Sequence, residues 1–287
     1  MDLNGLCGDL SSEKSTQDEK NNSVMIWSLA EAVQKQTLQI GSSACGATAV
    51  VNVLQALGFD ISSAVVDKCV QTKLRKHDAP LVEYLMSRSV AGATHQQLID
   101  GAEKASEGKV MGRFFSFYPE RSVELTAWLT SWMRKGAVAI ATMNMQVAVP
   151  EGEEIPDAWH HQMIFGVDTE GIYMTNPLEV EKRSLVERRL CSDSLLLVRQ
   201  QDILTRLSEG TDFSVLAQLP EHSLWEQVDV ARQVGQMVPK DVAPAEVSDS
   251  GFVIIPAAYR SGVTLFALRH SELANELLSA SELPLLH

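Results

Sequence analysis

The chain has little cysteine and no long apolar run. Four cysteines occur among 287 residues, and Cys7, Cys45, Cys69 and Cys191 are widely spaced with no CxxC pair. This spacing predicts neither a zinc site nor a disulfide framework, so we expect reduced thiols and no bound metal. Aromatic residues make up only 6%, and no apolar stretch approaches the roughly 20 residues that a membrane helix requires.

Basic residues are also scarce. The 24 Lys and Arg residues face 37 Asp and Glu residues, giving a formal charge of -13 that repels nucleic-acid backbones and anionic lipid surfaces. The N-terminal residues lack the basic start and apolar centre of a secretion signal, and no phosphate-binding or dinucleotide-binding loop is present. We therefore expect a cytoplasmic protein with no nucleic-acid or membrane partner, and with no cofactor.

Composition divides the chain into three parts. Residues 1–23 are mostly Ser, Asp, Glu, Lys and Asn, which predicts a disordered tail because there is too little apolar surface to bury. Residues 24–208 form the main domain. Residues 209–287 are a C-terminal extension that could complete the main sheet. Its segments 251–259 and 264–270 are expected to pair as a β-hairpin across RSGV, after a linker, PKDVAPAEVSDS.

Hydrophobic periodicity predicts a mainly helical half followed by a sheet-forming half, an α+β fold with an antiparallel sheet. Thr94 and Gln97 have the spacing of a capping box at the start of one helix. The expected helices are residues 44–57, 62–76, 80–90, 95–106 and 122–135, and the expected strands are residues 137–145, 160–167, 171–176 and 194–200.

Cys45 has the surroundings of a reactive thiol. It opens the helix 44–57, whose apolar residues recur every three or four positions, and a Gly/Ser loop precedes it. Unpaired N–H groups and the positive end of a helix dipole lower the pKa of a thiol at such a position. The alternative is a small buried core cysteine. Cys69 and Cys191 have no histidine partner in the pattern and are interpreted as structural, and Cys7 falls in the tail.

Three polar residues could complete a site around this thiol. Gln39 lies six positions before Cys45, where its amide and the Cys45 N–H could bind an oxyanion. His160 and the adjacent His161 open a strand and point to opposite faces, so only one can reach the thiol. Asn176 ends the next strand, where its amide oxygen could accept from the imidazole if the two strands pair. Each residue alone also has an ordinary structural explanation.

The order Gln39, Cys45, His160 and Asn176 resembles the Gln-Cys-His-Asn arrangement of papain-like cysteine peptidases. Two sequence motifs, CGATAVVNVL and HHQMIFGVDTEGIYMTNP, resemble the peptidase C39-like branch more closely, and this resemblance covers about residues 38–205. The resemblance implies a papain-like fold, with a helical lobe followed by a sheet lobe and the site in the cleft between them. Asn176 stands where that branch usually has aspartate, papain's Cys-Gly-Ser-Cys-Trp wording is absent, and no transporter segments follow.

By its spacing to Gly166, the family histidine falls on His160 rather than His161. The resemblance then implies a cysteine peptidase or amidase that forms a thioester acyl-enzyme on a peptide or amide substrate, with residues 24–208 as the catalytic domain. The alternatives are an acyltransferase or cyclase that forms an amide bond, and a catalytically silent peptide-binding module. An acidic loop at 151–154 would favour a cationic or neutral substrate if it borders the cleft. The pattern assigns no oligomeric state.

Overall fold

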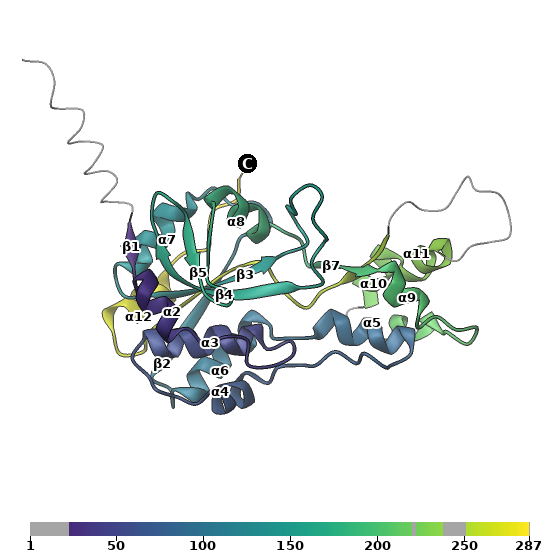
Figure 1. Ribbon diagram of the computed structural model, residues 1–287, viewed down its shortest axis with the longest axis horizontal. Coiled ribbons are helices and arrows are strands. Elements are labelled where there is room, and N and C mark those ends of the chain that lie inside the picture. Colours follow the sequence, from purple (N-terminus) through teal and green to yellow (C-terminus); the bar gives the residue numbers. More distant parts are fainter. Residues whose placement is uncertain (1–22, 220–221, 238–250, 287) are drawn as a thin grey trace, which may run out of the picture.

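The structure, a computed structural model, describes residues 23–219, 222–237 and 251–286. A seven-stranded antiparallel sheet forms the centre of the molecule (Figure 1), with the strand order β2-β9-β3-β4-β5-β6 and the short β1 paired to the end of β4. Its strands are β1 (Val24–Met25), β2 (Val110–Ser116), β3 (Val138–Asn144), β4 (Trp159–Val167), β5 (Ile172–Met174), β6 (Glu179–Glu181) and β9 (Gly262–Leu268). The α+β class with an antiparallel sheet is confirmed.

Helices cover both faces of this sheet (Figure 1). Residues of β3 alternate between the two cores, since Ala139, Ala141 and Met143 face one and Val138 and Ile140 the other. The first core is covered by α7 (Leu125–Met133), α8 (Arg183–Leu190) and α12 (Glu272–Ser279), and the second by α2 (Leu29–Lys35), α3 (Cys45–Ala56), α4 (Ser63–Val70) and α6 (His95–Ala105).

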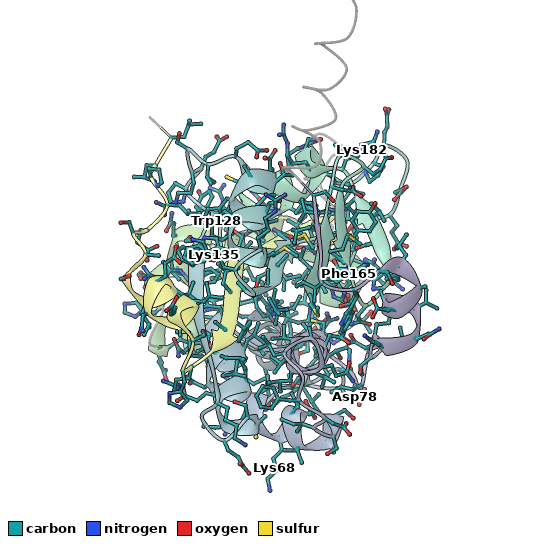
Figure 2. All side chains as sticks on the ribbon, turned by 90° about the vertical axis from the view of Figure 1, so that its left-hand side faces the viewer. Lys68, Asp78, Trp128, Lys135, Phe165 and Lys182 are labelled. Atoms are coloured by element: carbon teal, nitrogen blue, oxygen red, sulfur yellow. The ribbon has the colours of Figure 1, made fainter. Side chains whose placement is uncertain are left out.

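The second core holds the helix that begins at Cys45 against the strand that carries His160. Phe165 of β4 is fully buried there and lies well inside the packed side chains, whereas Lys68 and Lys182 lie at the periphery (Figure 2). The helix α3 is buried on nearly all sides, from Cys45 to Leu54. Because both elements are clamped by this core, the positions of their first residues are fixed relative to one another.

A third core lies beside the main sheet, at the right of Figure 1. It packs a two-stranded sheet, β7 and β8, against helices from both halves of the chain, so it includes residues on both sides of position 208. Its elements are α5 (Leu81–Val90), β7 (Leu195–Arg199), α9 (Gln200–Leu204), the 3-10 helix Phe213–Gln218, α10 (His222–Val228), α11 (Val230–Met237) and β8 (Phe252–Pro256).

Two expectations about strands were wrong. The expected hairpin of 251–259 with 264–270 does not form, because β8 pairs with β7 while β9 lies between β2 and β3. The half expected to be mainly helical also contains β2, which the sequence analysis missed. Four of the five expected helices and the pairing of β4 with β5 are confirmed, as is the capping box of Thr94 and Gln97. The expected helix 62–76 is too long, because α4 ends at Val70, where Gln71 adopts a left-handed conformation with a φ of 60°. Residues 1–22 of the predicted tail and the whole predicted linker, residues 239–250, lie outside the described residues.

Among the helices that the structure describes, none combines the length and the apolar content needed to cross a membrane.

Candidate active site

A cavity of about 330 Å³ opens beside the first turn of α3. Its walls include Cys45, Gln39, His160 and His161, which come from two distant segments of the chain. Asn176 lies behind His160 and touches it. We call this space the thiol cavity.

Cys45 is the first residue of α3, and the preceding Ala44 supplies no side-chain cap to the helix. The first-turn N–H groups are therefore available to the sulfur, and the N–H groups of Gly46 and His161 both hydrogen-bond it. No hydrogen bond occupies the Cys45 N–H within the described ranges. A thiolate at this position is stabilised by the helix end, and the Cys45 N–H stays available to a bound substrate.

Close packing places Cys45 against β4. A Cβ atom added at Gly46 would lie 2.8 Å from Leu98 Cδ2, 3.2 Å from Ala93 Cβ and 3.3 Å from His161 Cδ2. The start of α3 can approach α6 and β4 this closely because residue 46 is glycine.

The His160 imidazole lies between Cys45 and Asn176. Its Nε2 lies 2.6 Å from the Asn176 carbonyl oxygen, which only accepts, so Nε2 carries the proton and donates. The ring also hydrogen-bonds the Cys45 thiol, which leaves Nδ1 for the sulfur. The neutral form of His160 can then accept the thiol proton at Nδ1 without changing its contact to Asn176.

The two groups stabilise each other's charged forms. Burial opposes ionisation of the Cys45 thiol, but the hydrogen bond and charge of His160 outweigh burial, with help from backbone N–H groups, and lower the pKa of the thiol. Burial likewise opposes protonation of His160, but the bond to Cys45 and the Asn176 carbonyl outweigh it and raise the pKa of the imidazole. The geometry favours a thiolate–imidazolium pair.

Asn176 contacts His160 through its backbone and not through its side chain, so the expected contact from the amide oxygen was wrong. Its φ of 57° lies in the left-handed region, which asparagine tolerates better than most residues. The side-chain Nδ2 instead donates to Gln39 Oε1 at 3.0 Å, and the Asn176 N–H donates to Gln36 Oε1 at 3.1 Å. Two glutamines of the loop before α3 thus hold the carbonyl that orients His160.

The Gln39 amide lies at the mouth of the thiol cavity. Its oxygen accepts from Asn176, and its Nε2 donates one N–H to the Gly41 carbonyl at 2.9 Å. An amide nitrogen has two N–H groups, so one remains for a ligand. Together with the Cys45 N–H it can supply the two donors that an oxyanion requires.

The imidazole of His161 has hydrogen-bond partners other than the thiol. Its Nε2 donates to the Ala93 carbonyl at 2.9 Å, and its Nδ1 lies 3.0 Å from Thr142 Oγ1. Burial lowers the pKa of His161 to about 4, so it is neutral near pH 7. Of the two adjacent histidines, His160 is therefore the one whose imidazole hydrogen-bonds the Cys45 thiol.

The sequence analysis missed a polar seam on α3 that anchors the Gln39 loop. Asn52, fully buried, accepts from the Thr37 N–H at 2.7 Å, and its Nδ2 donates to the Thr37 carbonyl at 3.1 Å and to Thr175 Oγ1 at 3.3 Å. Thr48, one turn earlier, accepts from the Ile40 N–H at 3.2 Å. Two polar residues four positions apart in an otherwise apolar helix were the signal that could have revealed this seam.

The other thiols have different surroundings. Cys69 is half-buried in α4, and Cys191 follows α8, where burial and then the charge of Glu120 raise the pKa of the thiol. Neither lines the thiol cavity. Cys7 lies outside the described residues. Across residues 23–219, 222–237 and 251–286, no group of three or more His, Cys, Asp or Glu side chains is arranged to hold a metal ion.

The acidic loop at residues 151–154 does not border the thiol cavity. None of Glu151, Glu153 and Glu154 lines the thiol cavity, and Glu154 instead pairs with Arg199 at 2.9 Å. The walls carry Arg75, Arg88 and His77. The condition on which a preference for cationic substrates depended is therefore not met.

Comparisons with known proteins give distant structural likeness alone. No family model matches the chain, and neither does any curated protein. Among solved structures, a protein from Bacillus anthracis described as a C39-like peptidase aligns at 17% identity with a TM-score of 0.38, over 58% of this chain and 91% of the other.

Proposed function

We propose that this protein is a papain-like cysteine peptidase or amidase. Cys45 is the nucleophile, His160 the general acid and base, and Asn176 the residue that orients the imidazole. Gln39 and the Cys45 N–H bind the oxyanion. The observation that supports the proposal most strongly is the imidazole of His160, which is hydrogen-bonded to the Cys45 thiol on one side and to the Asn176 carbonyl on the other, at the wall of a cavity.

The proposed reaction has two stages. The Cys45 thiolate attacks the substrate carbonyl carbon, a C–S bond forms, and the carbonyl oxygen gains negative charge opposite the Gln39 amide. His160 gives its Nδ1 proton to the amide nitrogen as the C–N bond breaks, which releases an amine and leaves a thioester. Nδ1 then takes a proton from water, whose oxygen attacks the thioester and restores the thiolate.

Acyl transfer shares every step up to the thioester. An amine in place of water would attack the thioester and form a new amide bond, and His160 would take the amine proton. No contact in the site favours the amine over water, so hydrolysis is the leading proposal.

Alkylation of Cys45 by iodoacetamide across pH tests the nucleophile. We expect the rate to rise with an apparent pKa below the ordinary thiol value of 9.0, because the thiolate pairs with His160. In His160→Ala the burial remains and the partner is lost, so the pKa should return to that value or rise above it. At pH 7 the labelling rate should fall about tenfold, since the larger loss of thiolate is partly offset by its greater nucleophilicity.

His270→Ala is the matched control, because His270 is exposed and does not line the thiol cavity. Incubating a peptide mixture with the protein, with and without a primary amine, then separates new carboxyl ends from new amides, and Cys45→Ser should abolish both. Labelling of Cys45 that follows the pH profile of a free thiol would instead indicate a silent peptide-binding module.

A further inference from the structure

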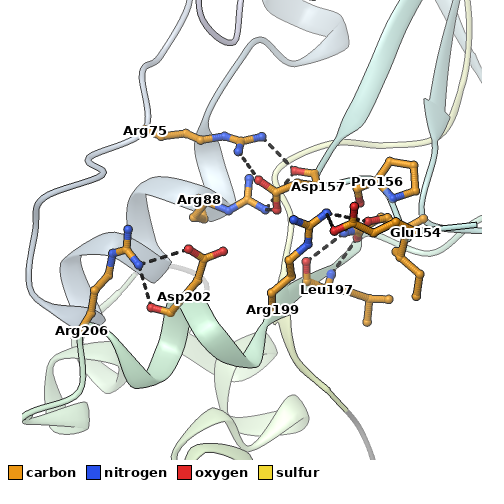
Figure 3. A network of polar contacts seen from close by, with 11 residues as sticks. Arg75, Arg88, Glu154, Pro156, Asp157, Leu197, Arg199, Asp202 and Arg206 are labelled. Carbon is orange, nitrogen blue, oxygen red and sulfur yellow. Dashed lines mark hydrogen bonds and ion pairs between the residues drawn. The ribbon is translucent and has the colours of Figure 1, made fainter.

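Among the residues that the structure describes, the wall of the thiol cavity carries two arginines and no carboxylate. Arg75 lies in the loop before α5 and Arg88 in the last turn of that helix. Figure 3 shows both guanidinium groups converging on Asp157, just before β4. This arrangement is unexpected in a chain with a formal charge of -13.

Asp157 holds both arginines in place. Its Oδ2 lies 2.5 Å from Arg75 Nη1 and its Oδ1 lies 2.6 Å from Arg88 Nη2. Its backbone carbonyl accepts from Arg75 Nη2 at 2.9 Å and from Arg88 Nη2 at 3.1 Å. One carboxylate thus balances two guanidinium groups, and one positive charge remains.

This surplus charge is largely removed from water. Arg88 is 2% exposed, and its Nη1 has no hydrogen-bond partner among the residues described. The buried Nε atoms of both Arg75 and Arg88 also have none. Since a buried cation without a full counter-charge is costly, a cluster with this imbalance favours a second anion in the cavity. Paired arginines suit carboxylates in particular, because their planar N–H groups match the two oxygens.

Tyr259 connects this cluster to the thiol. Its ring stacks on Trp159 at 5.7 Å between centroids, and its hydroxyl has no hydrogen-bond partner within the described ranges. Burial and then the charge of Cys45 raise the pKa of this hydroxyl, while Arg75 and Arg88 act on it in the opposite sense. Tyr259 therefore lies within electrostatic range of both groups and stays protonated as a donor.

We propose that the thiol cavity binds a substrate carboxylate at Arg75 and Arg88. The substrate class is then a small peptide or amide with a carboxylate close to the amide bond that Cys45 attacks. The cavity volume of about 330 Å³ lies at the low end of the range for small-molecule sites, which favours a compact ligand. This inference rests on the proposed function of Cys45.

Two alkylating reagents of similar size test the site without a known substrate. Iodoacetate carries a carboxylate and iodoacetamide is neutral, and with each the Cys45 sulfur forms a C–S bond as iodide leaves. We expect the ratio of the iodoacetate rate to the iodoacetamide rate to be higher for Cys45 than for 2-mercaptoethanol. In Arg75→Gln the ratio should fall about tenfold, which corresponds to ~1.4 kcal/mol.

Arg75→Gln removes the surplus charge and leaves the pair of Arg88 and Asp157 intact. Arg75→Lys keeps the charge and should keep most of the preference. Arg199→Gln is the matched control, since Arg199 also forms an ion pair with a carboxylate (Figure 3) but does not line the cavity. An unchanged ratio in Arg75→Gln, with rapid labelling by iodoacetamide, would overturn the carboxylate site and leave the nucleophile standing. If both reagents label Cys45 of the wild-type protein more slowly than they label 2-mercaptoethanol, the proposed function itself is refuted.

Protection of wild-type Cys45 distinguishes the two sources of a carboxylate and requires no variant. Short peptides should slow iodoacetamide labelling when they end in a free carboxylate, if the site reads a chain terminus. Amidated peptides that contain Glu should slow it more than their Gln counterparts, if the site reads a side chain. Equal protection by charged and neutral peptides in both comparisons would contradict the proposal.

Discussion

Replacing Asn52 by leucine should weaken the loop that carries Gln39 while leaving the thiol in place. Asn52 makes three hydrogen bonds from the buried face of α3, two to the backbone of Thr37 and one to Thr175. Leucine has the same number and branching of side-chain heavy atoms and is somewhat larger, so it removes the bonds without opening a cavity. The N–H and the carbonyl of Thr37 form part-buried hydrogen bonds with Asn52, and both groups would lose their partner.

The expected loss follows from those contacts. A hydrogen bond contributes about 0.5–1.5 kcal/mol net, so three bonds amount to ~3 kcal/mol of unfolding free energy. The bond to Thr175 is long, at 3.3 Å, and contributes less, so we expect the unfolding free energy to fall by ~2 kcal/mol. Peptide hydrolysis should also fall, about tenfold, because a misplaced Gln39 stabilises the oxyanion less well.

Two assays separate positioning from simple destabilisation. Denaturant unfolding measures the stability loss. Alkylation of Cys45 by iodoacetamide passes through no oxyanion, so its rate should change little in Asn52→Leu while hydrolysis falls. Gln55→Ala is the control, since Gln55 lies on the same helix and reaches only the Thr37 hydroxyl, at 3.3 Å. Hydrolysis at the wild-type rate in Asn52→Leu, or an equal loss in Gln55→Ala, would refute this reasoning.

Two further predictions concern the packing around the thiol. Gly46→Ala should cost ~1–3 kcal/mol and slow the alkylation of Cys45, because the added Cβ would lie 2.8 Å from Leu98 Cδ2 and displace the start of α3. Gly235→Ala, which meets nothing within 4 Å, should not destabilise, and a similar loss there would contradict the packing argument. Native stability should fall as the pH drops from about 6.5 to about 4, because the folded state holds the pKa of His161 near 4, below its ordinary value of 6.5. Protonation therefore favours the unfolded chain, by ~3 kcal/mol for this one group. His161→Gln should flatten that part of the pH–stability curve, and His270→Gln should not.

Most of the candidate site could be predicted from local patterns. A loop is followed at Cys45 by apolar residues at helical spacing, which predicts that the thiol lies at the start of a helix. Strand alternation separated His160 from His161, and the pairing of β4 with β5 brought Asn176 beside the histidine strand. These inferences succeed because side-chain direction in a helix or a strand repeats over a few residues and is written in the order of the chain.

Only the tertiary structure determined which distant segments meet. The β9 strand lies between β2 and β3, and β8 pairs with β7. Each strand pairs where its apolar face can be buried against a complementary face, and this partner need not be the next strand in the sequence. The Asn176 side chain donates a hydrogen bond to Gln39, and the backbone carbonyl of Asn176 accepts the hydrogen bond from His160. Likewise, nothing local to Arg75 or Arg88 indicates that they share Asp157 or line the cavity of Cys45. The sequence by itself determined the direction of each side chain along its own element, and the folding of the whole chain decided its neighbours.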